Sequence, residues 1–395
     1  MNKNFQKDWT VLIYINGNND IEPEIRQAML AIKNADINEN ANVLVQISRE
    51  EWNLVKIIRP LDNLPESDDK WVGVRRYYIK GRECILIEDL KKINMADPMC
   101  LYDFIKWGIK NYSAKNYMLI IGGHGCVLKG ALADYSQDNP YMMGIPEINI
   151  AIDKACKEVN SKIDILVIDM CYFNLLEIIY EFGKDKDHSV KSILTYIGEG
   201  PIQGLPYEKM INLLEENDTE DTIKKIIDNL NYNLVAFQVD NTKFEKIKSL
   251  FNELAHCYLD NKKEELKSYE LLSYLDVNQP WYSVIKDIKD SMNSIVIYSK
   301  KINNNLGLIN IMTYLPSDSN QLYSYYKLSF TSDNKWAYLI SDKKTIDNIN
   351  LELKPIKISY QAVCELISIM NPLLSTDDKE LILNNLINYK NWKLK

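Results

Sequence analysis

The sequence is poor in the residues that mark several classes of protein. Its 395 residues include only 14 glycines, 12 prolines and 3 histidines. So few glycines and prolines exclude collagen-like and low-complexity chains. The seven cysteines are odd in number, widely scattered and without a CxxC pair, so a secreted disulfide framework is not expected. This pattern favours a reducing, cytoplasmic compartment.

Long apolar runs and an excess of basic residues are also missing. No stretch approaches the roughly 18 apolar residues that span a bilayer. The start of the chain, MNKNFQKDWTVLIYIN, has one short apolar run and no cleavage site typical of a signal peptide. Lys and Arg number 47 against 55 Asp and Glu, which gives a formal net charge of −8. We therefore expect neither membrane insertion nor nucleic-acid binding.

The composition that remains, 46% apolar and 26% charged, is that of a globular protein large enough to bury a core without disulfides. In the first half, buried-looking strands alternate with amphipathic helices. The strands are WTVLIYI, NVLVQIS, VRRYYIK, YMLIIGG, IDILVID and SILTYI, and helices are expected near 23–34, 98–112 and 146–160. This alternation predicts an α/β fold with a mostly parallel sheet covered by helices on both faces. In such a sheet, active sites lie beyond the carboxyl ends of the strands.

The character of the chain changes after about residue 215, where lysine-rich amphipathic helices predominate. We therefore expect a catalytic core over residues 1–215 and a mostly helical C-terminal subdomain over 216–395. The segment NLGLINIMTYLP predicts that this subdomain adds a strand near 305–316 to the same compact unit. The tail is expected to be helical from about Ser359.

Two of the predicted strands end in residues suited to nucleophilic catalysis. YMLIIGG runs into Gly123-His124-Gly125, and IDILVID ends at Asp169, two residues before Cys171. A histidine about 50 residues ahead of a cysteine, each just past a strand, is the layout of caspase-type proteases. A thiol is mostly protonated at pH 7 and needs a nearby base, which His124 would supply. The amides of Gly125 and Cys171 would then form an oxyanion hole.

Other readings of the same residue types are weaker. Most cysteines near strand ends are buried and inert, so the prediction that Cys171 is a nucleophile depends on its spacing from His124. His188 lies in a charged turn and His256 on an amphipathic helix, where surface and structural roles are expected. His124 and Cys126 lack a second pair of zinc ligands. The loop NGNNDIEPE lacks the spacing of a calcium loop and is better explained as a polar helix entry.

The same segments resemble the clostripain family of cysteine peptidases, relatives of caspases and gingipains. The resemblance rests on WTVLIYINGNNDIE, on NMADPMCLYDFIKWGIKNYSAKNYMLIIGGHG and on IDILVIDMCYFNLLEIIYEF, and in weaker form it spans residues 9 to 340. By position, His124 matches the catalytic histidine of the family and Cys171 matches its nucleophile. The resemblance implies a caspase-like fold and no organic cofactor, and it allows calcium dependence.

The resemblance also implies a substrate class, because the family cleaves after Arg or Lys. Asp169 matches the aspartate two residues before the nucleophile, and a carboxylate there would bind a cationic side chain in the S1 pocket. Glu199, after SILTYI, is the second carboxylate expected there, although an exposed loop acid explains it nearly as well. Many members are zymogens cut between the histidine and the cysteine, and Lys129 is the expected site of self-cleavage. The chain departs from the family pattern at Met170, where a small residue is common.

We therefore expect a caspase-fold cysteine endopeptidase that acts on proteins or peptides with a basic residue before the scissile bond. Two alternatives stay open. One is a catalytically silent scaffold kept for binding or regulation, against which the retention of both His124 and Cys171 argues. The other is a cytoplasmic protease held latent until a protein partner or a cut activates it, which the lysine-rich C-terminal helices and the missing leader motivate.

Overall fold

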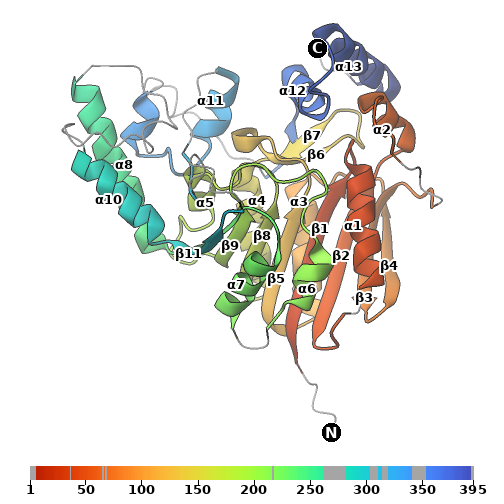
Figure 1. The fold of residues 1–395 in the computed structure, drawn as a ribbon, viewed down its shortest axis with the longest axis horizontal. Helices are drawn as coiled ribbons and strands as arrows, with labels where there is room; N and C mark the ends of the chain where they lie inside the picture. Colours follow the sequence, from red (N-terminus) through yellow and green to blue (C-terminus); the bar gives the residue numbers. More distant parts are fainter. Residues whose placement is uncertain are drawn as a thin grey trace.

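The fold, seen in a computed structural model, is built around one large sheet (Figure 1). The structure describes residues 6–392 except for 36, 65, 67–68, 216–217, 262–281, 303–309, 314–318 and 340–352. The strands of the large sheet are β1 (Lys7–Gly17), β2 (Ala41–Arg49), β3 (Gly73–Lys80), β4 (Glu83–Lys91), β5 (Ala114–Gly122), β8 (Ile163–Asp169), β9 (Val190–Tyr196), β10 (Leu234–Gln238) and β11 (Val296–Lys300). They lie in the order β11-β10-β9-β8-β5-β1-β2-β3-β4.

The centre of this sheet is parallel and its two edges are antiparallel. Strands β9, β8, β5, β1 and β2 run in one direction. The pairs β3–β4 and β10–β11 continue the sheet in antiparallel fashion. Strands β2 and β8 are buried along their whole length, as expected for strands in the middle of a sheet covered on both faces. The predicted mostly parallel sheet is confirmed.

Helices cover both faces of the sheet, as the sequence predicted. One face carries α3 (Pro98–Asn111), α4 (Ile145–Glu158) and α5 (Leu176–Glu181), and the other carries α1 (Glu22–Asn34), α6 (Tyr207–Asn212) and α7 (Thr219–Asn229). Side chains of β1 alternate between the two cores, with Leu12 in the first and Val11 and Ile13 in the second. Helix α3 begins where expected, because the Asp97 side chain accepts a hydrogen bond from the Met99 amide.

A second group of helices lies beside β10 and β11. It comprises α8 (Asn241–Asn261), α10 (Tyr282–Asn293), α11 (Ser319–Tyr326) and the 3-10 helix η2 (Lys335–Leu339). The strand expected near 305–316 falls mostly outside the described residues. Within 310–313, Met312 forms an isolated parallel bridge with Leu175. The division of the chain at residue 215 stays a prediction, and β10 and β11 beyond it extend the sheet of the first half.

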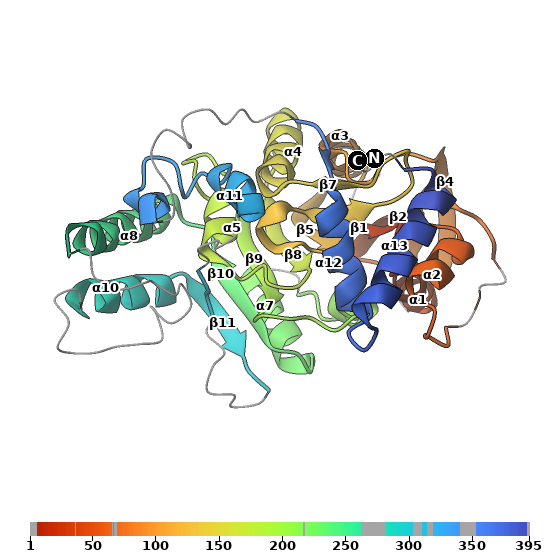
Figure 2. The ribbon, with the colours of Figure 1, turned by 90° about the horizontal axis from the view of Figure 1, so that it is seen from above.

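A small layer lies above the carboxyl ends of the central strands (Figures 1 and 2). It consists of the sheet β12-β7-β6 with β6 (Ala131–Asp134), β7 (Tyr141–Met143) and β12 (Ile356–Lys357), the 3-10 helix η1 (Val127–Lys129), and helices α2 (Trp52–Ile58), α12 (Tyr360–Met370) and α13 (Thr376–Lys390). The predicted helical tail is confirmed, since Ser359 caps α12 by accepting a hydrogen bond from the Ala362 amide. This layer therefore covers the edge where a site is expected.

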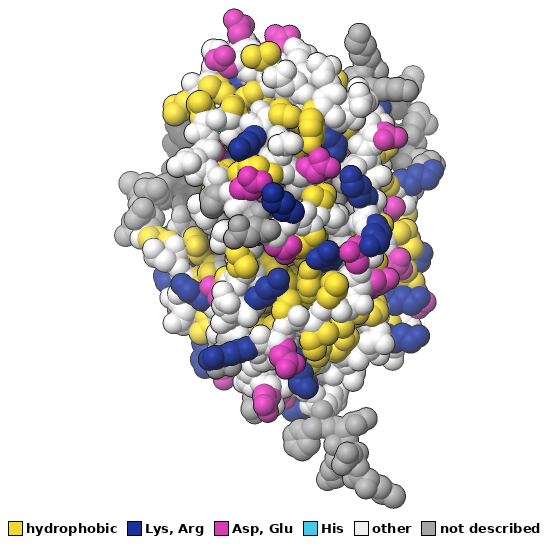
Figure 3. Space-filling model, turned by 90° about the vertical axis from the view of Figure 1, so that its right-hand side faces the viewer, with side chains coloured by type: hydrophobic (Ala, Val, Ile, Leu, Met, Phe, Trp, Pro, Cys, Tyr) yellow, Lys and Arg dark blue, Asp and Glu magenta, His cyan; other side chains and the backbone are white. Residues whose placement is uncertain are grey.

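The surface beside β4 mixes apolar and charged side chains (Figure 3). On this edge strand, Ile85, Leu86 and Ile87 are 39 to 48% exposed. Glu83 and Lys91 at its two ends place charges on the open edge, which opposes pairing with another chain. Over the described residues, no helix has both the length and the apolar character needed to cross a membrane.

Candidate active site

Matched strand ends bring the two predicted catalytic residues together. Strands β5 and β8 are paired so that Gly122 lies opposite Asp169, and each is the last residue of its strand. His124 and Cys171 each follow two residues later. Because both strands are parallel and end at the same level, both side chains reach the same edge of the sheet.

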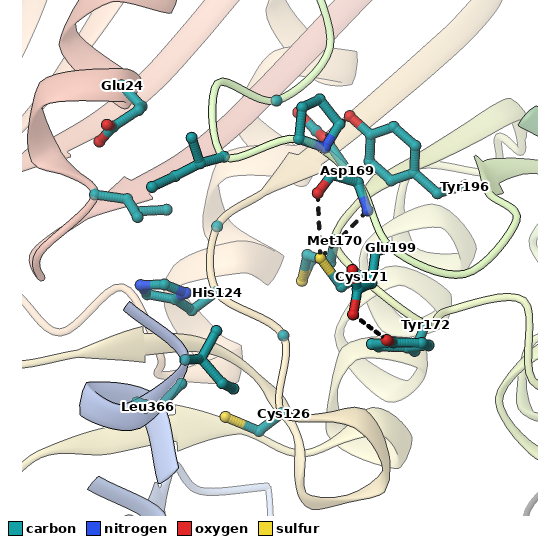
Figure 4. Close-up of a pocket in the computed structure, with 18 of the residues that line it drawn as sticks. Glu24, His124, Cys126, Asp169, Met170, Cys171, Tyr172, Tyr196, Glu199 and Leu366 are labelled. Atoms are coloured by element: carbon teal, nitrogen blue, oxygen red, sulfur yellow. Dashed lines mark hydrogen bonds between the residues drawn. The ribbon is translucent and has the colours of Figure 1, made fainter. Parts of the chain in front are cut away.

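A cavity of about 700 Å³ opens at this edge (Figure 4). It is lined by the loops after β5, β8 and β9, by α1 and by α12. Every site residue predicted from the sequence lies in its wall: His124, Gly125, Lys129, Asp169, Cys171 and Glu199. The structure therefore brings the whole predicted set into one cavity.

The Cys171 thiol is half-buried and held by the loop after β9. Its Sγ atom accepts a hydrogen bond from the Gly200 amide at 3.4 Å and lies 3.7 Å from the Gly200 carbonyl oxygen. Burial raises the pKa of Cys171, the Gly200 amide opposes this, and the charges of Glu199 and Asp169 raise it further. Within the described part of the chain, Cys171 and His124 do not hydrogen-bond to each other. The thiol is therefore protonated at neutral pH in this arrangement.

His124 pairs with a carboxylate that the sequence analysis did not select. Its Nε2 atom lies 3.1 Å from Oδ2 of Asp20, and the Asp20 side chain is 2% exposed. Burial lowers the pKa of His124, but the charge and hydrogen bond of Asp20 raise it more, so the pKa lies above its usual value. In turn, burial raises the pKa of Asp20, but His124 lowers it more. The pair is thus suited to hold an imidazolium beside a carboxylate.

Asp20 reaches His124 because the turn after β1 is fixed by its neighbours. Nδ2 of the Asn19 side chain donates to the Ala133 carbonyl oxygen at 2.7 Å, and Nη1 of Arg59 donates to the carbonyl oxygen of Asp20 at 3.0 Å. The loop NGNNDIEPE does lead into α1, but Asp20 has a second role in it that the sequence did not reveal. The sequence does place an acid just past an apolar strand. Its proximity to His124 could be inferred only once β1 was known to lie beside β5.

The backbone around His124 and Cys171 leaves two amides available for an oxyanion hole in the part of the chain that the structure describes. The amides of Cys126 and Leu132 make the hydrogen bonds of the turn after His124. Among the described residues, the amides of Gly125 and Cys171 have no acceptor. A Cβ atom on Gly125 would lie 3.1 Å from the Cβ of Met170, so glycine allows this turn to lie close to the nucleophile loop.

Asp169 lies buried below the cavity and is held by three donors. Its carboxylate accepts hydrogen bonds from the Tyr196 hydroxyl at 2.8 Å, the Leu205 amide at 2.9 Å and the Tyr207 hydroxyl at 2.5 Å. Burial raises the pKa of Asp169, and these hydrogen bonds lower it in part. The carboxylate is therefore fixed in place by neutral donors.

The other carboxylates of the cavity differ in how they are compensated. Three are paired with a cation of the chain at 2.6 to 2.9 Å: Glu24 and Asp62 with Arg59, and Glu365 with Lys129. In the described residues, Asp169 and Glu199 have no cationic partner, and exposed Glu199 accepts a hydrogen bond from Tyr172. The negative charge left in the cavity therefore sits at the two positions that the sequence predicted.

Lys129, the expected site of self-cleavage, does not lie in an open loop. It ends η1, its side chain is 12% exposed, and its Nζ atom lies 2.6 Å from Glu365 of α12. The next carbonyl oxygen, that of Gly130, accepts a hydrogen bond from the Cys126 amide. The bond after Lys129 is thus not accessible to a protease in this conformation.

A calcium or zinc centre does not fit the residues that the structure describes. Among them, no three His, Cys, Asp or Glu side chains converge as metal ligands. The other two histidines lie apart from the cavity, where His188 contacts the Asp185 carbonyl oxygen and His256 contacts Lys335.

Comparisons with known proteins give a family and a fold. The model of the clostripain family matches residues 13–349. A secreted C11 cysteine protease from Bacteroides thetaiotaomicron, solved with an irreversible peptide inhibitor, is similar with a TM-score of 0.60 and 13% identity, over 82% of this chain and 98% of that chain. An inactive zymogen C11 protease from Parabacteroides distasonis is similar with a TM-score of 0.57 and 16% identity, over 85% of this chain and 99% of that chain. These structures support the caspase-like fold, and no curated protein matches the sequence.

Proposed function

The chain belongs to the clostripain family of cysteine peptidases, and from this we propose that it is an endopeptidase cleaving after basic residues with Cys171 and His124. One observation carries the proposal. Cys171, His124 and Asp20 follow the ends of three adjacent parallel strands, β8, β5 and β1, and the buried Asp20 carboxylate lies 3.1 Å from His124. This is the arrangement of groups that activates a thiol.

In the proposed reaction each group has a role. The Cys171 thiol passes its proton to His124, and the thiolate attacks the carbonyl carbon of the scissile bond. The amides of Gly125 and Cys171 stabilise the oxyanion. His124 then gives its proton to the leaving amine, which leaves a thioester on Cys171. Water, deprotonated by His124, hydrolyses the thioester and restores the thiol.

Asp20 determines which nitrogen of His124 exchanges protons with Cys171. Because Nε2 faces Asp20, Nδ1 is the nitrogen left for exchange of protons with Cys171. The buried carboxylate stabilises the imidazolium that forms when Cys171 loses its proton. Asp20 acts through His124 and is therefore a positioning residue.

The preference for Arg or Lys follows from the uncompensated charge in the cavity. A cationic side chain leaving water needs an opposite charge close by. Asp169 and Glu199 offer that charge, whereas the carboxylates paired with Arg59 and Lys129 do not. We place the residue before the scissile bond between Asp169 and Glu199.

Peptides that end in Arg, Lys, Asp or Leu before a fluorescent leaving group test this function. We expect wild type to cleave only the basic peptides, Cys171→Ala to cleave none, and Cys126→Ala, which changes the other thiol in the cavity, to stay active. Glu199→Gln should lower kcat/KM for Arg peptides by about tenfold or more, whereas Asp62→Asn should change it little. Cleavage by Cys171→Ala, or equal cleavage of the Leu peptide, contradicts the proposal.

The family also bears on activation and location. One solved neighbour is described as an inactive zymogen, and we propose that this chain is likewise made latent and is cut after Lys129 or switched on by a protein partner. Intact mass followed over time in wild type and Cys171→Ala tests self-cleavage. The expected cytoplasmic location stays a prediction, since another neighbour is described as secreted.

A further inference from the structure

The C-terminal segment, residues 353–392, lies above the carboxyl ends of the central strands (Figures 1 and 2). We call it the C-terminal cover; it holds β12, α12 and α13. Helix α12 supplies one wall of the cavity through Glu365, Leu366, Ile369 and Met370. The match to the clostripain family ends at residue 349, so the cover is an addition to the part of the chain that matches the family.

The cover has its own small core. Its apolar side chains pack with α2 and with the β6–β7 hairpin in a cluster apart from the two that sandwich the large sheet: Leu54, Ile58, Ala133, Tyr135, Met142, Ile358, Ala362, Val363, Leu366, Ile367, Ile382, Leu383, Leu386 and Trp392. A segment with a separate core can move without opening the main cores to water.

The polar contacts of the cover are made to the outer layer of the molecule. Strand β12 pairs with β7, the Ile358 amide donates to the Pro140 carbonyl oxygen at 2.8 Å, and Nζ of Lys390 lies 3.1 Å from Glu50. The Asn371 side chain donates to the Ile58 carbonyl oxygen at 2.8 Å, the Tyr389 hydroxyl donates to Glu51 at 2.5 Å, and the Trp392 indole donates to the Gln137 carbonyl oxygen at 3.1 Å. None of these partners belongs to a strand of the large sheet. The cover is therefore attached to the outer layer of the molecule.

One contact links the cover directly to the active site. Glu365 of α12 lies 2.6 Å from Lys129, five residues after His124, and Lys129 is almost fully enclosed. Leu366 lies beside this pair and is 2% exposed. The Lys129–Glu365 pair thus joins the turn that follows His124 to the cover.

We propose that the C-terminal cover is an autoinhibitory element of this chain and that the Lys129–Glu365 pair is its latch. The inference rests on the proposed peptidase function, whose substrate must enter past α12. With the latch closed, Cys171 stays half-buried, without a hydrogen bond to His124 among the described residues, and Lys129 stays out of reach of a protease. Opening the latch exposes the nucleophile and the processing site in one step.

The test measures access to Cys171 and needs no peptidase activity. Full-length wild type, Glu365→Lys, Lys129→Glu and the double charge swap are treated with a bulky maleimide, and labelling of Cys171 is followed by peptide mass mapping. Glu365→Lys places two cations together, so we expect labelling about tenfold faster than in wild type, the factor that corresponds to about 1.4 kcal/mol. Lys129→Glu should act alike, and the swap should return labelling to the wild-type rate.

Two controls make the result decisive. Glu380→Lys alters an exposed acid of α13 in the same cover and should label as wild type does. Glu365→Gln removes the pair without repulsion and serves if Glu365→Lys fails to fold, with faster labelling again expected. Equal labelling of wild type and the folded latch variants overturns the proposal, as does a swap that stays as fast as Glu365→Lys. If the latch variants are labelled fast but no variant hydrolyses basic peptides, the proposal about the cover stands and the proposed peptidase function is refuted.

Discussion

Replacing Asp20 with asparagine removes the charge that faces His124 and keeps the size of the side chain. The Nε2–Oδ2 distance is 3.1 Å and both groups are largely enclosed, so solvent screens the pair weakly. In wild type the pKa of His124 lies above its usual value, because Asp20 outweighs the effect of burial. In Asp20→Asn only burial remains as a strong influence, so the pKa of His124 falls below 6.5.

The size of this change follows from a single buried charge at contact distance. We expect the pKa of His124 to fall, and each unit of that fall corresponds to about 1.4 kcal/mol. The raised pKa of His124 stabilises the folded state below pH 6.5, and this contribution is lost as the pH rises through the folded pKa. The lowered pKa of Asp20 stabilises it above pH 3.8, and this is lost as the pH falls through the folded value. Asp20→Asn should therefore cost most stability between pH 3.8 and 6.5.

The assay is a pH titration of the imidazole signals by NMR in a Cys171→Ala background, which prevents self-cleavage. Only three histidines contribute signals, so His124 can be assigned by one substitution. Asp62→Asn is the matched control, because Asp62 lines the same cavity but pairs with Arg59. A His124 pKa that stays unchanged or rises in Asp20→Asn refutes the role of Asp20. In the active background, the same substitution should lower kcat/KM for basic peptides by about 10 to 100-fold.

Three further predictions concern the surroundings of the site. Burial raises the pKa of Asp134 to about 6, so the free energy of unfolding should fall by up to about 3 kcal/mol as the pH rises from 4 to 6. Urea titrations should show a flatter pH dependence in Asp134→Asn, and an unchanged pH dependence contradicts the raised pKa of Asp134. A Cβ on Gly204, which has φ +70°, would lie 2.6 Å from Oδ2 of Asp169, so Gly204→Ala should lower the free energy of unfolding by about 1 to 3 kcal/mol. Gly81, with φ +56°, has no atom within 4 Å of such a Cβ, so Gly81→Ala should lower it less, and equal losses would exclude the contact with Asp169 as the cause. Tyr207→Phe removes the 2.5 Å hydrogen bond to Asp169 and should lower kcat/KM for Arg peptides about tenfold. The decrease for Leu peptides should be smaller, and an equal decrease for both would argue against Asp169 as the site that binds the cation.

The central part of the fold could be predicted because buried parallel strands are rich in Val, Ile and Leu. Strand β8 reads IDILVID and is buried throughout, and α3 carries its own start signal in Asp97 and Pro98. Edge strands give weaker signals. Strand β4, with an exposed and mixed sequence, was not predicted, and neither was β10, which is five residues long.

The predicted dyad followed from strand ends, whereas its surroundings depended on contacts that no local pattern encodes. Asp20 gained its role from the strand order β8-β5-β1, which juxtaposes segments about 100 residues apart. The Lys129–Glu365 contact joins residues 236 positions apart. The tail could be predicted as helical from its periodicity, but nothing in that pattern indicates which surface it covers.

The most direct measurement of the central claim is the site of covalent labelling by an irreversible, thiol-directed peptide that ends in Arg. Two thiols line the cavity, Cys171 and Cys126, and burial raises the pKa of Cys126 to about 12. The account predicts a single adduct on Cys171 by intact mass and peptide mapping, formed faster in Glu365→Lys and much more slowly in His124→Ala. An adduct on Cys126, or labelling of Cys171 that is independent of His124 and of the Arg side chain, contradicts it.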